Sequence, residues 1–234
     1  MDATLVTAHS EKDGAAGTFK HGFGFHPMQA YCDESGEALA ALLRPGNAGA
    51  NTAADQIAVG DLALAQIPTL HVERIGMLLR ADSAAATHEL IDWCRDARIE
   101  FSVGYDLTEP VRQAILETPE NSWVPALDQD RTVRANGEVT EVTARVDLPS
   151  WPRGTRLICR RERPHPGAQL SFTDHDGYRF QCFITDQSDP DIAGLERRQR
   201  ERARVETRSA TTRTPGWRSS RSRAFRSTRC GSSS

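Results

Sequence analysis

Residues 75–83 read Ile-Gly-Met-Leu-Leu-Arg-Ala-Asp-Ser, and this stretch decides the expected fold. Ile75–Leu79 is a short apolar run without alternation, which is typical of a strand buried on both faces of a sheet. The run ends in a polar group that contains Asp82. The sequence therefore predicts a buried strand that ends in a carboxylate.

The region before this strand is expected to form an antiparallel meander. Three segments with strand character, Ala3–Ala8, Phe19–Tyr31 and Ala38–Leu43, are separated by short polar turns that contain glycine. Such short connections favour strands that pair with their neighbours in the chain. We therefore expect three strands ahead of the buried one.

Helical periodicity appears on both sides of the buried strand. Asn51 or Thr52 is expected to cap a helix that runs to Pro68, and Thr87 to start another. Phe101–Tyr105 is then expected to be a fifth strand, and Glu109–Leu116 a short helix. This mixture of strands and helices predicts an α/β fold with a mixed sheet.

A β-rich region is expected from Trp123 onward. Apolar and polar residues alternate over 142–148, and Arg156–Arg160 and Tyr178–Thr185 also have strand character. A basic helix is expected at Ile192–Glu206. We therefore divide the chain into a core at 1–122, a β-rich insertion at 123–186, a core helix at 187–206 and a tail at 207–234.

Composition excludes several classes of protein. No apolar stretch approaches the roughly 18–20 residues that span a bilayer, and no signal peptide begins the chain, so a cytoplasmic protein is expected. The five cysteines form no CxxC pair, which argues against a zinc finger and for buried free thiols. The net charge is −3, but seven arginines in the tail hide a strongly acidic remainder. The tail is mostly Ser, Thr and Arg, and we predict it to be disordered.

Three carboxylates stand at positions from which they could form one site. Asp2 opens the first strand, Asp82 ends the fourth, and Glu206 lies on the last helix. If the first and fourth strands are neighbours, Asp2 and Asp82 would lie close together, and a helix packed across them could bring Glu206 into range. Carboxylate oxygens are the ligands that Mg²⁺ prefers, and a pair of such ions can activate a nucleophile and stabilise a leaving oxygen.

The chain contains six short stretches that belong together as a set: Asp2–Val6, Lys20–Pro27, Leu43–Ala48, Leu79–Ser83, Phe101–Asp106 and Arg202–Glu206. In order and content the set resembles the catalytic domain of bacterial insertion-sequence transposases of the DDE type, the group called transposase DDE domain group 1. No single stretch is specific, but the set covers residues 2–206.

The resemblance implies a ribonuclease H-like fold with a β insertion before the last catalytic helix. It also implies DNA strand cleavage and transfer of the 3′ end to a target during DNA transposition. By position, Asp2, Asp82 and Glu206 would be both the catalytic and the metal-binding residues, holding two Mg²⁺ ions for which Mn²⁺ can substitute. Double-stranded DNA, as transposon ends and target, would be the partner; a homodimer is left open, and no membrane is involved.

Arginines are the candidates for contact with DNA phosphates. Arg160 and Arg161 lie in the β-rich region, and Arg198, Arg202 and Arg204 lie on the last helix. Each phosphate contact would add to a salt-dependent affinity for DNA. For Arg160 and Arg161, an ordinary solvated surface is the alternative.

The last helix only partly follows the pattern of the related transposases, which is Tyr-x2-Arg-x3-Glu-x6-Lys. Arg202 and Glu206 fit this spacing, whereas Gln199 replaces Tyr and Arg213 replaces Lys. Those transposases also have sequence before the first Asp and an apolar helical segment after the Glu. We therefore expect this chain to be a truncated, frameshifted and inactive copy. Glu196 and Glu201 are rivals of Glu206 for the role of third carboxylate.

Two other functions are open at this stage. The chain could be a non-catalytic fragment that binds DNA or a transposase, or a stand-alone metal-dependent nuclease. Asp82 could also be a plain helix cap or turn residue, and His26 a strand histidine with a satisfied hydrogen bond. Binding of transposon ends without Mg²⁺-dependent nicking would favour the first function, and nicking of random plasmid the second.

Overall fold

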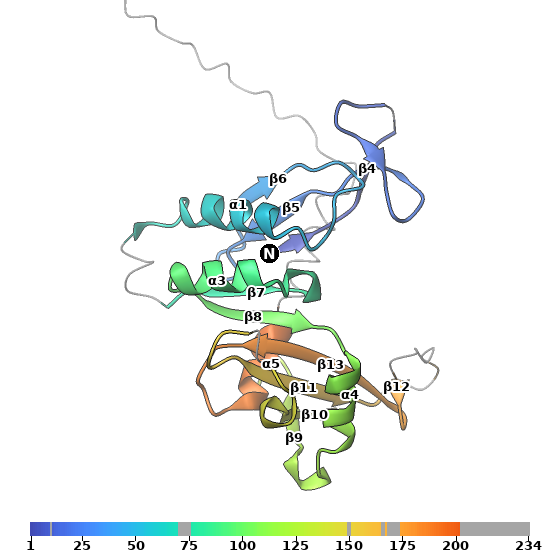
Figure 1. Ribbon diagram of the computed structural model, residues 1–234, viewed down its shortest axis with the longest axis vertical. Helices are drawn as coiled ribbons and strands as arrows, with labels where there is room; N and C mark the ends of the chain where they lie inside the picture. The colour runs from blue at the N-terminus through green and yellow to red at the C-terminus, as the bar shows by residue number, and fades with distance from the viewer. Residues whose placement is uncertain (10, 70–75, 149–150, 165–166, 168–173, 202–234) are drawn as a thin grey trace, which may run out of the picture.

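The computed structural model describes residues 1–9, 11–69, 76–148, 151–164, 167 and 174–201. Within these ranges the chain forms three sheets and four α-helices, so the expected mixed α/β class is confirmed (Figure 1). The predicted tail and the end of the predicted last helix lie outside the described residues.

The N-terminal region forms two small antiparallel sheets. One has the strand order β1 (Asp2–Ala3), β5 (Met28–Tyr31) and β6 (Ala38–Leu42). The other has the order β2 (Val6–Thr7), β4 (Phe23–Phe25) and β3 (Ala16–Gly17). The meander is therefore confirmed in outline. The prediction that 3–8 and 19–31 are single strands was wrong, because each segment crosses from one sheet to the other.

The main sheet is mixed. Its order is β7 (Leu78–Ala81), β8 (Glu100–Tyr105), β13 (Tyr178–Thr185), β11 (Arg156–Glu162), β10 (Val133–Glu141) and β9 (Val124–Leu127), with β12 (Asp174–His175) beside β13. Only β7 and β8 run parallel; the other pairs are antiparallel. Because β8 pairs directly with β13, the strands of region 123–186 extend the sheet that contains β7. The domain boundaries themselves stay a prediction.

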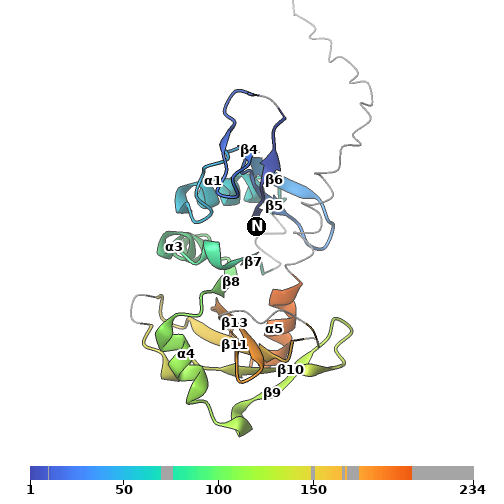
Figure 2. The ribbon, with the colours of Figure 1, turned by 90° about the vertical axis from the view of Figure 1, so that its right-hand side faces the viewer.

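The helices begin where the sequence places their caps. The α-helices are α1 (Ala53–Leu64), α3 (His88–Asp96), α4 (Glu109–Leu116) and α5 (Ile192–Arg200). Thr52 is the N-cap residue of α1, and the Thr87 hydroxyl accepts the N–H of Leu90 at the start of α3. Asp191 caps α5 by accepting the N–H of Gly194 at 2.9 Å. Figure 2 shows α5 beside the strands of the main sheet.

The predicted strand at 142–148 was wrong. The strand β10 lies earlier and ends at Glu141, and a 3₁₀ turn, η3 (Thr143–Arg145), follows. The Arg145 N–H donates to the Val142 carbonyl, and the Thr143 hydroxyl accepts the N–H of Leu157. The apolar alternation is present in the sequence, but the Arg145–Val142 bond closes a local turn. Pairing of β10 with β9 and β11 overrides the alternation.

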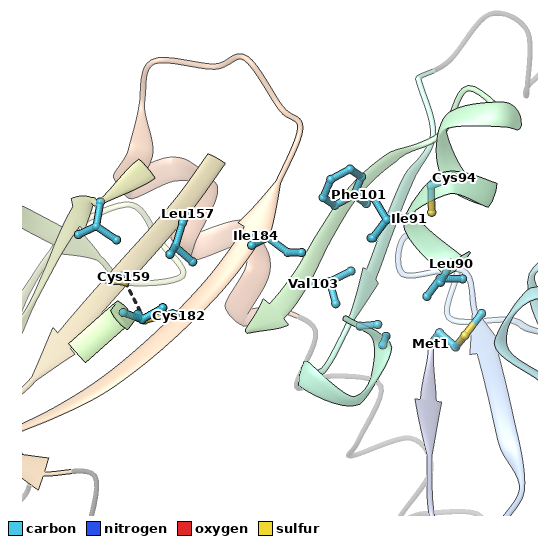
Figure 3. Close-up of a cluster of buried hydrophobic side chains, with 14 of the residues drawn as sticks. Met1, Leu90, Ile91, Cys94, Phe101, Val103, Leu157, Cys159, Cys182 and Ile184 are labelled. Carbon is cyan, nitrogen blue, oxygen red and sulfur yellow. Dashed lines mark hydrogen bonds between the residues drawn. The ribbon is translucent and has the colours of Figure 1, made fainter. Parts of the chain in front are cut away.

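The largest core lies where α3 packs on β8. Leu90, Ile91 and Cys94 of α3 are fully buried, as are Phe101 and Val103 of β8 (Figure 3). The apolar residues that the sequence pattern places on one face of α3 and of β8 are therefore the residues that these elements bury. A smaller core lies under α5, where Leu195 packs with residues of four strands: Ala126, Val139, Ile158 and Phe183.

The described cysteines are free thiols, as the sequence indicates. Cys94, Cys159 and Cys182 are buried, and Cys32 is half-buried. Burial raises the pKa of Cys94 to about 12, and burial also raises the pKa of Cys159. Because the thiolate is the reactive form, these two thiols contribute to packing and not to chemistry.

Asp186 connects the end of β13 to the neighbouring strand β8. It follows β13, and its carboxylate accepts the N–H of Phe101 at 2.8 Å. Burial raises the pKa of Asp186 above its usual value, although this hydrogen bond opposes the shift. A carboxyl group with a higher pKa in the folded state favours folding below its unfolded pKa, which is about 4. That contribution is lost as the pH rises through the folded-state pKa.

Replacing Asp186 by asparagine is therefore expected to stabilise the protein at pH 7 relative to the wild type, and to have a smaller effect at pH 3. Asparagine keeps the acceptor for Phe101 but never carries the buried charge. Urea unfolding at both pH values measures the difference. Asp189→Asn, at an exposed position, serves as control. An equal difference at the two pH values would contradict the assignment to Asp186.

None of the helices formed by the described residues is both long and apolar enough to cross a membrane.

Candidate active site

The start of the chain lies against the end of β7. The amino group of Met1 donates to the Arg80 carbonyl at 2.8 Å, and the Met1 side chain is buried in the main core. In Figure 3, β1 leads away from Met1 in the same direction as β7 and β8. The Met1 bond thus joins the small sheet of β1 to the main sheet, between which no strand ladder is formed by the described residues.

The geometry of this bond gives the alignment of the two acids. Each residue of a parallel strand pair has a partner opposite it on the neighbouring strand. A residue's N–H can donate to the carbonyl of the residue that precedes this partner. The pair β7–β8 shows this pattern, because Glu100 lies opposite Leu78 and its N–H donates to Met77. Applied to the bond from Met1 to Arg80, the same pattern puts Met1 opposite Ala81. The next residues along the two segments are Asp2 and Asp82.

Asp82 stands where β7 leads into the 3₁₀ turn η1 (Ser83–Ala85). It occupies the N-cap position, but its side chain accepts no cap hydrogen bond. Its carbonyl oxygen, by contrast, accepts the N–H of Ala85 at 3.2 Å. Asp82 is half-buried. Capping therefore does not account for this carboxylate, which leaves it available for another role.

Asp82 borders a cleft of about 330 Å³. The cleft is formed by the ends of β7 and β8, by β11 and β13, and by α5. Its walls combine charged, amide and aromatic side chains with backbone: Asp82, Ser83, Gly104, Tyr105, Asp106, Leu107, Arg160, Phe180, Gln181, Cys182, Phe183, Glu196, Gln199 and Arg200. The predicted strand-end aspartate thus lies at the edge of a concave surface of mixed polar and apolar character.

The last described helix packs against the same strand end. The side-chain amide of Gln199 on α5 donates to the Ala81 carbonyl at 3.1 Å, and Arg80 donates to the Arg198 carbonyl at 2.5 Å. A helix near the two acidic strands was expected from the sequence. Glu206, Arg202 and Arg204 lie outside the described residues, so their predicted roles stay predictions.

The two rival glutamates form ion pairs with arginines. Glu196 is 4% exposed and borders the cleft, with Arg200 at 2.9 Å and Arg160 at 3.4 Å. Glu201 lies 2.6 Å from Arg197 and 3.5 Å from Arg80. In the described part of the chain, no three Asp, Glu, His or Cys residues form a cluster that could hold a metal ion. Only two of the three predicted carboxylates lie in that part.

Two of the predicted DNA-contact arginines are buried. Arg160, 8% exposed, pairs with Glu162 and Glu196. Arg161, 7% exposed, pairs with Glu138 and Glu120. Its guanidinium carbon also lies 4.3 Å from the ring centroid of Trp123 and 4.8 Å from that of Tyr178. Their charges are thus balanced within the fold, and phosphate contact at these positions stays a prediction that burial does not favour.

The buried His26 has a satisfied hydrogen bond, as the structural alternative for this residue predicted. Its Nδ1 lies 2.8 Å from the Ala48 carbonyl. The Arg44 guanidinium in turn donates to the His26 carbonyl at 3.0 Å. These contacts assign His26 to the packing of the N-terminal sheets.

Comparison with known families agrees with this arrangement. The family model described as transposase DDE domain group 1 matches residues 1–223. The chain belongs to the transposase DDE domain group 1 family. The transposase resemblance seen in six sequence stretches is confirmed by this match. A search of curated proteins gives no match.

Membership of this family supports a transposase-type function in DNA transposition. DDE transposases act on DNA and generally use divalent metal ions. Sequence reasoning missed the cleft and the place of Glu196 in it, because neither feature has a signal in residue spacing.

Proposed function

We propose that this chain carries the catalytic core of a DDE transposase, with Asp2 and Asp82 as two metal-binding carboxylates and Glu206 as the third. The observation that carries the proposal is the hydrogen bond from Met1 to Arg80. If this bond follows the parallel pattern of β7 and β8, Asp2 would lie opposite Asp82. A shared metal site requires carboxylates that are far apart in sequence to lie side by side, and this alignment would supply two of them.

The order of strands supports a ribonuclease H-like core. With the Met1 bond included, the spatial order is β6, β5, β1, β7 and β8. In chain order these are the third, second, first, fourth and fifth strands of the core. The first three are antiparallel, and β7 runs parallel to β8. Asp2 lies in β1, and Asp82 directly follows β7.

The donor set suits Mg²⁺ or Mn²⁺. Asp2 and Asp82 supply hard carboxylate oxygens, which these ions prefer over nitrogen or sulfur. When bound, the ions lower the pKa of a water or hydroxyl nucleophile and stabilise charge on phosphate oxygens. The chain itself would hold the ions at the strand ends and admit a DNA strand to the cleft beside Asp82. Arg198, with Arg202 and Arg204, would approach the phosphates.

Replacing Asp82 by asparagine is expected to weaken Mn²⁺ binding about tenfold or more, because a charged oxygen ligand becomes neutral. Electron paramagnetic resonance of free Mn²⁺ measures the affinity, and Mn²⁺-dependent nicking of supercoiled plasmid measures activity. Asp92→Asn makes the same chemical change on the exposed side of α3 and should alter neither quantity. Equal Mn²⁺ affinity of the wild type and Asp82→Asn would reject the proposed site.

The same experiment separates the alternative functions. Binding of transposon-end DNA without nicking would favour a non-catalytic fragment, which agrees with our expectation of an inactive copy. Nicking without preference for transposon ends, abolished in Asp82→Asn, would favour a metal-dependent nuclease. Strand transfer to a target would establish an active transposase.

A further inference from the structure

Arg80 makes contacts with three segments that are far apart in the sequence. Its guanidinium donates to the Asp33 carboxylate and to the Arg198 carbonyl, each at 2.5 Å. A third contact, with the Glu201 carboxylate, is 3.5 Å long. The Arg80 carbonyl accepts the Met1 amino group. The side chain is 13% exposed, so these contacts are made largely out of water.

The contact with Arg198 gives a hydrogen-bond donor to a carbonyl group in the last turn of α5. The last carbonyl groups of an α-helix have no partner within the helix and carry its negative end. Arg198 is in the final turn of α5, which ends at Arg200. A guanidinium at this place both donates to a free carbonyl and complements the helix dipole. Glu201, next to the helix end, adds a charge-assisted contact.

The contact with Asp33 fixes the other side of β7. Asp33 lies in the turn between β5 and β6, where the Gly36 N–H donates to Cys32. The sheet of β5 and β6 shares no ladder with the main sheet in the described ranges. Side-chain bonds of Arg80 therefore link β7 to the turn on one side and to α5 on the other.

These bonds converge just before Asp82. Arg80 binds α5 through its side chain, and Ala81 accepts the amide of Gln199 from the same helix. Two successive residues of β7 thus fasten the end of α5, and the next residue is the proposed metal ligand. Any rotation of α5 away from the strand would break both bonds.

We propose that Arg80 is a positioning residue that fixes the end of α5 and the Asp33 turn against the strand end that carries Asp82. This inference rests on the proposed function, because Arg80 can act as a positioning residue only if Asp82 binds the metal ion. Arginine suits the role since its planar guanidinium offers five donors in different directions. Lysine has the same charge but lacks the planar set of donors, so Arg80→Lys could preserve only some of these contacts.

The test compares Arg80→Gln with a matched variant, Arg156→Gln. Arg156 is the same kind of clamp: it donates to the carbonyls of Gln187 and Asp189 at 2.8 and 2.7 Å and pairs with Glu141 at 2.7 Å. It lies on β11, separated from β7 by β8 and β13. Both variants thus lose carbonyl and carboxylate contacts, but only one loses them beside Asp82.

Two measurements are made on the full chain: hydrogen–deuterium exchange of the peptide 192–200, and the Mn²⁺ dissociation constant. Arg80→Gln is expected to speed exchange at the end of α5 about tenfold, the equivalent of about one charge-assisted hydrogen bond. It should also weaken Mn²⁺ binding severalfold, with partial recovery in Arg80→Lys. Arg156→Gln should leave both quantities near the wild-type values.

The outcomes separate this inference from the proposed function. If both variants change exchange in 192–200 equally, Arg80 is one stabilising arginine among others and the inference fails. If exchange differs as expected but Mn²⁺ affinity in Arg80→Gln is that of the wild type, the clamp exists without a positioning role, and the inference also fails. If the wild type binds no Mn²⁺ at all, the proposed metal site fails, and with it the purpose assigned to Arg80.

Discussion

Replacing Phe101 by alanine is expected to lower the free energy of unfolding by about 3–5 kcal/mol. Phe101 is fully buried on β8, where it packs against α3. Its backbone is also held on both sides, because its N–H donates to Asp186 and its carbonyl accepts the Thr185 hydroxyl at 2.6 Å. The strand therefore cannot shift to fill the space, and the lost ring leaves a cavity.

Urea denaturation followed by circular dichroism measures this loss. Phe19→Ala deletes the same ring at a position that is 66% exposed, and its effect should stay within about 0.5 kcal/mol. A loss below about 1 kcal/mol in Phe101→Ala would mean that the core closes over the site. In that case α3 would not be held against β8 as tightly as the packing indicates.

Replacing Gly104 by alanine is expected to cost about 2–3 kcal/mol and to displace Asp82. A β-carbon at position 104 would lie 2.7 Å from the Ser83 nitrogen and 3.0 Å from the Asp82 carbonyl carbon. Both are backbone atoms, so no side-chain rotation can relieve the contact. The strand β8 and the turn after β7 would have to separate at the proposed metal ligand.

Stability and Mn²⁺ affinity should therefore fall together in Gly104→Ala. Gly17→Ala is the control, because a β-carbon at Gly17 meets no atom within 4 Å. It should change neither quantity. Unchanged Mn²⁺ affinity in Gly104→Ala would show that the position of Asp82 is not set by its contact with β8.

Local patterns predicted several elements closely. Glu109–Leu116 is a helix with the expected bounds, and Thr87 caps α3 through its hydroxyl. A strand before Asp82 is present, although it ends at Ala81 and not at Leu79. The prediction that it is buried on both faces was wrong, because of its four residues only Ala81 is buried and β7 lies at the edge of the main sheet. These features depend on cap chemistry and on the period of apolar residues, which act within a few positions of the chain.

The failures share one cause. Residues 142–148 alternate like a strand, but the chain there folds into η3 because β10 takes the place between β9 and β11. Likewise, His26 and Pro27 divide one predicted strand between two sheets, as His26 bonds to Arg44 while Pro27 accepts the N–H of Thr4. Which neighbour a strand finds is a long-range property that alternation does not encode.

By itself, the sequence determined the family through six stretches of residues, the α/β class, the strand that leads to Asp82 and the acidic candidates themselves. These follow from residue identity and short-range periodicity. Only the tertiary structure decided that Met1 bonds to Arg80, that Gln199 reaches Ala81 and that Glu196 pairs with Arg160. Such contacts join residues roughly 40 to 120 positions apart, because packing of the whole chain and not local preference brings them within hydrogen-bonding distance.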